Sequence, residues 1–92
     1  MSSPTSNTVT FFWRPGCPFC GHLERHLVAN DVELEYRNIW DDPEAAAFVR
    51  SVANGNETVP TVTVGQTSMV NPTIDQVLEA LSSVTSPGAS AP

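Results

Sequence analysis

The sequence predicts one α/β domain in which three helices flank a four-stranded mixed sheet, with the element order βαβαββα. Two observations predict this class: strand-like and helix-like periodicities alternate along the chain, and two strand-like runs around a short turn precede a last amphipathic segment. A strand joined through a helix to the next strand implies a right-handed parallel crossover, whereas a tight hairpin must be antiparallel. The sheet is therefore expected to be mixed, with helices on both faces.

The first half of the domain is expected to contain a strand, a helix and a second strand. Residues 9–13 form a β-rich run that Arg14-Pro15-Gly16 ends, and this strand is expected to be central. Over residues 18–28 apolar side chains recur near helical spacing behind a proline at the first position. Residues 32–39 alternate apolar and polar side chains with the two-residue period of a half-covered strand.

The second half is expected to contain a helix, a hairpin and a last helix. Its segments are a helix between 41–44 and 54–56, strands at 61–64 and 67–70 around a Gly-Gln turn, and a helix behind Thr73. Two aspartates, a proline and a glutamate suit the positive end of the first of these helices. Thr73 with Gln76 three residues later forms a capping box.

The two ends of the chain differ from the domain in composition. Residues 1–7 and 84–92 are rich in Ser, Thr, Pro, Gly and Ala, and such segments bury too little apolar surface to offset the entropy of ordering. We therefore expect a flexible tail at each end of a domain over 8–83. Neither an apolar run of membrane-spanning length nor a signal-peptide pattern occurs, which predicts a cytoplasmic protein without a membrane segment.

Charge and cysteine content exclude two classes of function. The chain has ten acidic residues against four arginines and no lysine, a net charge of −6, which gives a nucleic-acid backbone nothing to bind. Two cysteines separated by two residues do not form the disulfide framework of a secreted domain. No interface-sized apolar patch can be read from the pattern, so a monomer is expected.

Cys17 and Cys20 carry the predicted chemistry, thiol–disulfide exchange, which requires a thiolate. A helix that begins at Pro18 directs its unpaired N–H groups at the Cys17 sulfur and stabilises the anion, and Arg14 adds attraction. Cys20 returns beneath Cys17 on the first helical turn and is expected to be the more buried and less acidic thiol. Cys17 is therefore predicted to attack a disulfide, and Cys20 or a second small thiol to release the product.

Two alternatives use the same cysteines. Cys17, Cys20, His22 and His26 could in principle bind zinc, although all four would have to converge from one turn and one helix, unlike the spacing of zinc fingers. We expect no metal and interpret the histidines as solvent-exposed helix residues. An inert structural cysteine pair is the second alternative, which the strand–loop–helix setting disfavours.

Residues 8–82 resemble a glutaredoxin. Three motifs carry the resemblance: Cys17-Pro18-Phe19-Cys20, Thr58-Val59-Pro60 before the hairpin, and Asn71-Pro72-Thr73-Ile74-Asp75 at the last helix. It implies a thioredoxin/glutaredoxin fold, thiol–disulfide oxidoreductase activity and no tightly bound cofactor. It also implies a cis Val59–Pro60 peptide facing the cysteines, whose Val59 backbone groups pair with a bound thiol like one more strand. A plain loop proline is the alternative at this position.

The last motif distinguishes between small thiols. Glutaredoxins that bind glutathione usually carry a Gly-Gly-x-Asp-type turn whose amides hold a carboxylate, whereas Asn71-Pro72 stands here and proline donates no N–H. With residues 39–43 and 54–60, this turn makes the chain most similar to the actinobacterial mycoredoxins, which reduce mixed disulfides with the sugar thiol mycothiol. The resemblance implies mycothiol as co-substrate, with mycothiolated proteins and the NADPH-dependent reductase of the thiol as partners. The residues expected to bind the thiol substrate are Arg14, Pro18, Phe19, Thr58, Val59, Pro60, Asn71, Pro72 and Thr73.

Two other functions stay open at this point. One is a redoxin that thioredoxin reductase reduces directly and that donates electrons to ribonucleotide reductase. The other is a non-catalytic protein that binds zinc or an iron–sulfur cluster, which Pro18 and the competing Cys17–Cys20 disulfide disfavour.

Three aromatic residues and one acid near these motifs have two interpretations each. Phe19 is either an exposed contact for substrates or a packed first-turn residue, and Trp13 either packs simply within the strand or also lies at the edge of the site. Trp40 either walls the ligand groove or packs at the sheet edge. Asp75 is interpreted as a first-turn charge rather than a ligand contact.

Overall fold

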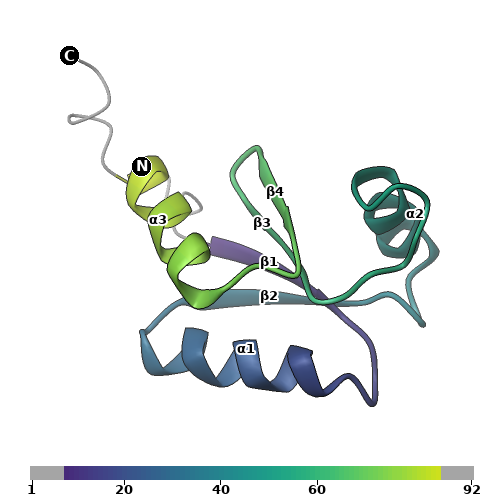
Figure 1. Ribbon diagram of the computed structural model, residues 1–92, viewed down its shortest axis with the longest axis horizontal. Coiled ribbons are helices and arrows are strands. Elements are labelled where there is room, and N and C mark those ends of the chain that lie inside the picture. Colours follow the sequence, from purple (N-terminus) through teal and green to yellow (C-terminus); the bar gives the residue numbers. More distant parts are fainter. Residues whose placement is uncertain (1–7, 86–92) are drawn as a thin grey trace.

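The computed structural model describes residues 8–85, and it contains the predicted elements in the predicted order (Figure 1). The strands and helices are β1 Thr8–Trp13, α1 Pro18–Ala29, β2 Glu33–Asn38, α2 Pro43–Val52, β3 Thr61–Val64, β4 Thr67–Val70 and α3 Ile74–Thr85. The predicted fold class is therefore confirmed.

The four strands form one sheet in the order β2-β1-β3-β4, so β1 is central as predicted. β1 is parallel to β2 and antiparallel to β3, and the β3–β4 hairpin is antiparallel. Because α1 follows β1 directly in the chain, the C-terminal end of β1 and the start of α1 lie at the same end of the sheet (Figure 1). Cys17 lies at this end, between β1 and α1.

Two apolar clusters cover the two faces of the sheet. The larger joins β1 and β3 to α1 and α3 through buried residues that include Phe11, Leu27 and Val77. The smaller packs Phe12 against Val49 of α2 and stacks its ring on that of Phe48, with centroids 5.0 Å apart. Alternate residues of one strand thus face opposite layers, as the two-residue period of a strand requires. Helices lie on both faces, as predicted.

The boundaries differ from the predicted ones by one or two residues. β2 covers 33–38 rather than 32–39, and α3 extends to Thr85, two residues beyond the predicted domain end at 83. The apolar stripe of α3, formed by Ile74, Val77, Ala80 and Leu81, packs on the larger core cluster. The rest of the two predicted tails, 1–7 and 86–92, lies outside the described residues. Over residues 8–85, no helix is long and apolar enough to cross a membrane.

Candidate active site

Cys17 lies at the N-cap of α1, directly after the turn that ends β1. Gly16 in that turn has φ +79°, a conformation that glycine adopts without the steric cost of a side chain. Pro18 then begins the helix, and the Cys20 N–H donates a hydrogen bond of 3.3 Å to the Cys17 sulfur. The sulfur therefore takes the place of a capping oxygen, where a negative charge is stabilised by the helix N-terminus.

The loop before β3 closes over this sulfur. The Val59–Pro60 peptide bond is cis, as the resemblance implied, and the Cys17 thiol donates to the Val59 carbonyl across 3.7 Å. Val59 packs against both apolar clusters, so its backbone is fixed between the two layers. Thr58 stabilises this loop, because its carbonyl accepts a hydrogen bond of 2.8 Å from the Thr61 hydroxyl.

Cys20 is much less accessible than Cys17. Only 4% of Cys20 is exposed, whereas Cys17 is half-buried, and both sulfurs are free thiols. Burial, followed by the hydrogen bond with Cys17, raises the pKa of the Cys20 thiol to about 12. The prediction that Cys20 is the more buried of the two thiols is therefore confirmed.

One hollow of about 250 Å³ lies between the cysteines and β2, and we call it the β2-side hollow. It is lined by Phe11, Trp13, Arg14, Gly16, Cys17, Cys20, Gly21, Glu24 and Tyr36. The Tyr36 hydroxyl donates to the Glu24 carboxylate across 2.8 Å, and this hydrogen bond, more than burial, raises the pKa of Tyr36. Charged and apolar groups therefore face the same space as the two sulfurs.

A second hollow of about 300 Å³ lies between α1 and the start of α3, and we call it the α3-side hollow. It is lined by Phe19, His22, Leu23, His26, Pro60, Asn71, Pro72, Thr73 and Ile74. None of these residues is a lysine, an arginine or a carboxylic acid. The two imidazole rings pack edge to face with centroids 4.6 Å apart. This hollow combines an apolar lining with polar side chains that can form hydrogen bonds.

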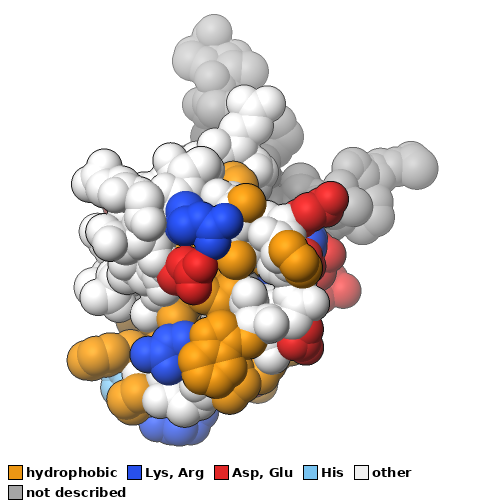
Figure 2. Space-filling view, turned by 90° about the vertical axis from the view of Figure 1, so that its right-hand side faces the viewer, with side chains coloured by type: hydrophobic (Ala, Val, Ile, Leu, Met, Phe, Trp, Pro, Cys, Tyr) orange, Lys and Arg blue, Asp and Glu red, His pale blue; other side chains and the backbone are white. Residues whose placement is uncertain are grey.

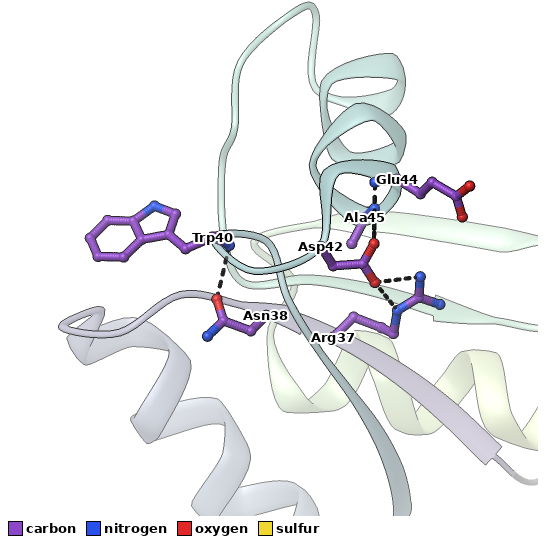
Figure 3. A network of polar contacts seen from close by, with 6 residues as sticks. All are labelled: Arg37, Asn38, Trp40, Asp42, Glu44 and Ala45. Carbon is purple, nitrogen blue, oxygen red and sulfur yellow. Dashed lines mark hydrogen bonds and ion pairs between the residues drawn. The ribbon is translucent and has the colours of Figure 1, made fainter.

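Two exposed aromatic residues lie beside these hollows. Phe19 is 65% and Trp40 64% exposed, and the Arg14 guanidinium carbon lies 5.7 Å from the centre of the Trp40 ring, a cation–π distance. Hydrophobic side chains gather beside a basic one on the end of the molecule that carries α2 (Figure 2). Trp40 projects away from the polar contacts of Arg37 and Asp42 and lines neither hollow (Figure 3). It flanks the site through Arg14.

The structure divides the predicted thiol-binding residues into groups. Five of them line the α3-side hollow: Phe19, Pro60, Asn71, Pro72 and Thr73. Arg14 lines the β2-side hollow, Val59 contacts Cys17, and Pro18 and Thr58 line neither hollow. Phe19 is therefore an exposed residue with a contact surface, rather than one buried in the helix packing.

Sequence reasoning missed Glu24, Tyr36 and the histidines as lining residues. Glu24 stands four residues after Cys20, a spacing that places both on one helix face and could have identified it. Tyr36 enters the site through the parallel register that pairs it with Phe11, which no local pattern indicates. In the described part of the chain, no three His, Cys, Asp or Glu side chains are placed to hold a metal ion.

A thiol at a helix N-terminus, a second thiol one turn later and a cis-proline loop against the first sulfur define a redox protein of thioredoxin-like fold. Residues 9–69 match the glutaredoxin family profile. The chain belongs to the glutaredoxin family, and it is accordingly a thiol–disulfide oxidoreductase.

Two curated relatives support this assignment. The chain is 37% identical over 70 residues to "Putative glutaredoxin Rv3198A" of Mycobacterium tuberculosis H37Rv, an alignment that covers 75% of this chain and 83% of the relative. It is 33% identical over 73 residues to Mycoredoxin 1 of Corynebacterium glutamicum, which covers 78% of this chain and 90% of that relative.

Solved structures agree on the fold. The thioredoxin-like protein BC3987 superposes with a TM-score of 0.69 at 19% identity, covering 78% of this chain and 97% of the other. A glutaredoxin from Archaeoglobus fulgidus gives 0.63 at 21% identity, covering 79% and 84%. At these identities the likeness concerns the fold alone.

Proposed function

We propose that this protein reduces mixed disulfides between proteins and a small thiol, and that the thiol is mycothiol. The Cys17 thiolate attacks the sulfur of the small thiol, a new disulfide forms between the two, and the substrate protein leaves as a thiolate that takes up a proton. Either Cys20 or a second mycothiol then attacks this mixed disulfide. The first route yields the Cys17–Cys20 disulfide and free mycothiol, and the second yields mycothiol disulfide and the Cys17 thiolate.

The choice of mycothiol rests on the backbone N–H groups at three successive positions before α3. The Asn71 N–H donates to the Pro60 carbonyl at 2.7 Å, Pro72 has no N–H, and the Thr73 N–H donates to Gln76 Oε1 at 2.9 Å. None of the three offers a free donor to a ligand carboxylate. Glutathione carries two carboxylates, whereas the sugar part of mycothiol carries none, so this turn favours the sugar thiol.

The side chains of the α3-side hollow support the same choice. His22, His26, Asn71 and Thr73 provide hydrogen-bonding groups for hydroxyls, and Phe19 with the two prolines provides apolar surface for a sugar ring. The hollow also borders Pro60, whose neighbour Val59 contacts the reactive sulfur. A thiol bound through its sulfur at Cys17 can therefore extend into it.

The 33% identity of this chain to a protein named Mycoredoxin 1 adds independent support for mycothiol as the small thiol. The cycle would draw its electrons from NADPH through the reductase of the small thiol, and we propose a cytoplasmic monomer as its setting.

An NADPH-coupled assay tests the proposal with a model mixed disulfide. Three parallel reactions contain mycothiol with its reductase, glutathione with its reductase, and thioredoxin reductase alone. We expect turnover with mycothiol and little with the other two. Efficient turnover with glutathione would overturn the choice of thiol, and rapid reduction by thioredoxin reductase would favour the redoxin alternative.

A single substitution sharpens the assay. Pro72→Gly restores one free backbone N–H at the turn and removes apolar surface from the α3-side hollow, so it should raise the glutathione rate relative to the mycothiol rate. Glu79→Gln, on the exposed side of α3, is a control that changes charge without altering the turn. An unchanged ratio of the glutathione rate to the mycothiol rate in the Pro72→Gly variant would contradict the role given to these amides.

A further inference from the structure

Release of the product through Cys20 requires that a buried thiol lose its proton. Cys20 is 4% exposed, and burial, the largest cause of its raised pKa, remains when Cys17 is in the mixed disulfide, so little Cys20 thiolate exists near neutral pH. The thiolate, and not the thiol, is the attacking species in disulfide exchange. A nearby proton acceptor would therefore accelerate the step in which Cys20 attacks Cys17.

The β2-side hollow contains such an acceptor among the residues that line it with both cysteines. Glu24 lies four residues after Cys20, so the two side chains share one face of α1, and both line this hollow together with Cys17. Tyr36 reaches in from β2 and donates to the Glu24 carboxylate at 2.8 Å. The carboxylate is thereby held at the wall of the hollow while its remaining lone pairs stay available.

The hollow also suits water. Its volume of about 250 Å³ exceeds that of single water molecules several-fold, and its lining includes Trp13, whose Nε1 is buried without a hydrogen-bond partner among the described residues. A buried N–H of this kind is normally satisfied by water when no protein acceptor is present. A water chain between Cys20 and Glu24 is therefore compatible with the size and the polarity of the space.

We propose that Glu24 accepts the proton of Cys20, through water in the β2-side hollow, when Cys20 resolves the mixed disulfide on Cys17. The Cys20 sulfur forms a bond to the Cys17 sulfur, and the bond between Cys17 and the small thiol breaks. The small thiol leaves with the electron pair, and the Cys20 proton passes to Glu24 and then to the leaving thiolate or to solvent. The two cysteines are oxidised to a disulfide and the small thiol is reduced.

The other ionisable groups around the hollow do not fill this role. Arg14 carries no acceptor, and Tyr36 presents its hydroxyl proton to Glu24. Cys17 is bound in the mixed disulfide during this step, and both histidines line the α3-side hollow instead. Among the residues lining this hollow, Glu24 is the carboxylate.

A dipyridyl disulfide separates the two steps in one experiment. Attack by Cys17 releases one coloured thiopyridone, and attack by Cys20 on the resulting mixed disulfide releases the second. In Glu24→Gln we expect the first release to keep its rate and the second to slow by about tenfold or more near pH 7, the scale of general-base catalysis. The unchanged first step also shows that Cys17 keeps its reactivity in the variant.

The pH dependence distinguishes proton transfer from a structural effect. Without the carboxylate, the second rate should rise in proportion to hydroxide concentration, whereas the wild-type rate should be nearly flat between about pH 6 and 8. Tyr36→Phe should slow the second release by less than Glu24→Gln does, and Glu79→Gln should leave both releases unchanged.

Three results would overturn the proposal: a Glu24→Gln variant with the wild-type second rate, a faster second rate caused by removing the negative charge, or an equal slowing by Glu79→Gln. Because the probe contains no mycothiol, its outcome is independent of which small thiol the protein uses.

Discussion

The helices α1 and α2 each begin with a proline and an N-cap side chain that accepts backbone hydrogen bonds. At α1 the acceptor is the Cys17 sulfur, 3.3 Å from the Cys20 nitrogen. At α2 it is the Asp42 carboxylate, which accepts from the Glu44 and Ala45 nitrogens at 3.2 Å each. Both helix ends therefore present backbone N–H groups to the N-cap side chain, one N–H at α1 and two at α2.

The two helix ends differ in the other contacts of the N-cap side chain. Arg37 donates to Asp42 through Nε at 2.9 Å and through a second nitrogen at 2.7 Å, which fixes the carboxylate in an ion pair (Figure 3). Among the described residues Cys17 makes no such ion pair, and it faces a carbonyl and a hollow. The Asp42 carboxylate is held in place and supports the helix, whereas the Cys17 sulfur is left free to react.

The largest expected effect comes from replacing the sulfur at the α1 N-cap. Cys17→Ser keeps a capping oxygen, so the thermal unfolding midpoint should stay nearly unchanged while reductase activity falls to the uncatalysed background. Reductase assays and thermal unfolding of this variant measure the two roles of Cys17, nucleophile and N-cap, separately. A variant that retains full activity would refute Cys17 as the nucleophile.

Cys20→Ser should have the next largest effect. It should block only the route in which Cys20 attacks the mixed disulfide. Reduction that ends with a second small thiol should continue, because Cys17 and its cap are intact, whereas formation of the internal disulfide is lost. Mass spectrometry of the protein during turnover should show the Cys17 mixed disulfide accumulating. Loss of the first attack as well would mean that Cys20 also supports the Cys17 thiolate.

Alkaline pH should affect the α1 end rather than the α2 end. The pKa of Cys20 rises from 9.0 to about 12 on folding, so the folded protein keeps a proton that the unfolded chain releases above pH 9. The contribution of the protonated Cys20 thiol to the free energy of unfolding is therefore complete below pH 9. It declines as the pH rises from 9 towards 12. Urea unfolding of the reduced protein measures this decline, which Cys20→Ala should reduce.

Substitution at the α2 end should give the reverse of the Cys17→Ser result. Asp42→Ala removes the cap and the ion pair, and we expect Tm to fall by about 4 °C while reductase activity stays within about twofold. Asp42→Asn keeps a capping oxygen but loses the ion pair, so its Tm should lie between those of the wild type and the alanine variant. Equal losses in both variants would assign the stability to the ion pair alone.

The comparison also shows which features a sequence reveals. Caps, turns and strand periods are local, and Cys17, Pro43, Thr73 and the hairpin were therefore predicted at the correct places. The Val59–Pro60 contact was predicted through the resemblance rather than through local physics. The nearly complete agreement on the fold follows because each local preference points to the same architecture.

The features that could not be predicted depend on register and on distance in space. Arg37 meets Asp42 because β2 ends just before the α2 cap, and Tyr36 meets Glu24 because β2 pairs in parallel register beside α1. Neither contact follows from a periodic pattern. The division of the site into two hollows follows from how α1 packs between β2 and α3, which single-sequence reasoning did not reach.

Acid pH should produce the smallest effect, and it should come from the α2 end. The hydrogen bond from Arg37, followed by that from the Ala45 N–H, lowers the pKa of Asp42 below its ordinary value of 3.8. Because the folded-state pKa is the lower one, the contribution of the carboxylate is complete above about pH 4 and is lost as the pH falls through the folded value. Comparing urea midpoints of the wild type and Asp42→Asn between pH 6 and pH 2 should show the two curves converging. Curves that stay parallel would mean that Asp42 gains nothing from ionisation, and the helix end at α2 would then support its anion no better than water does.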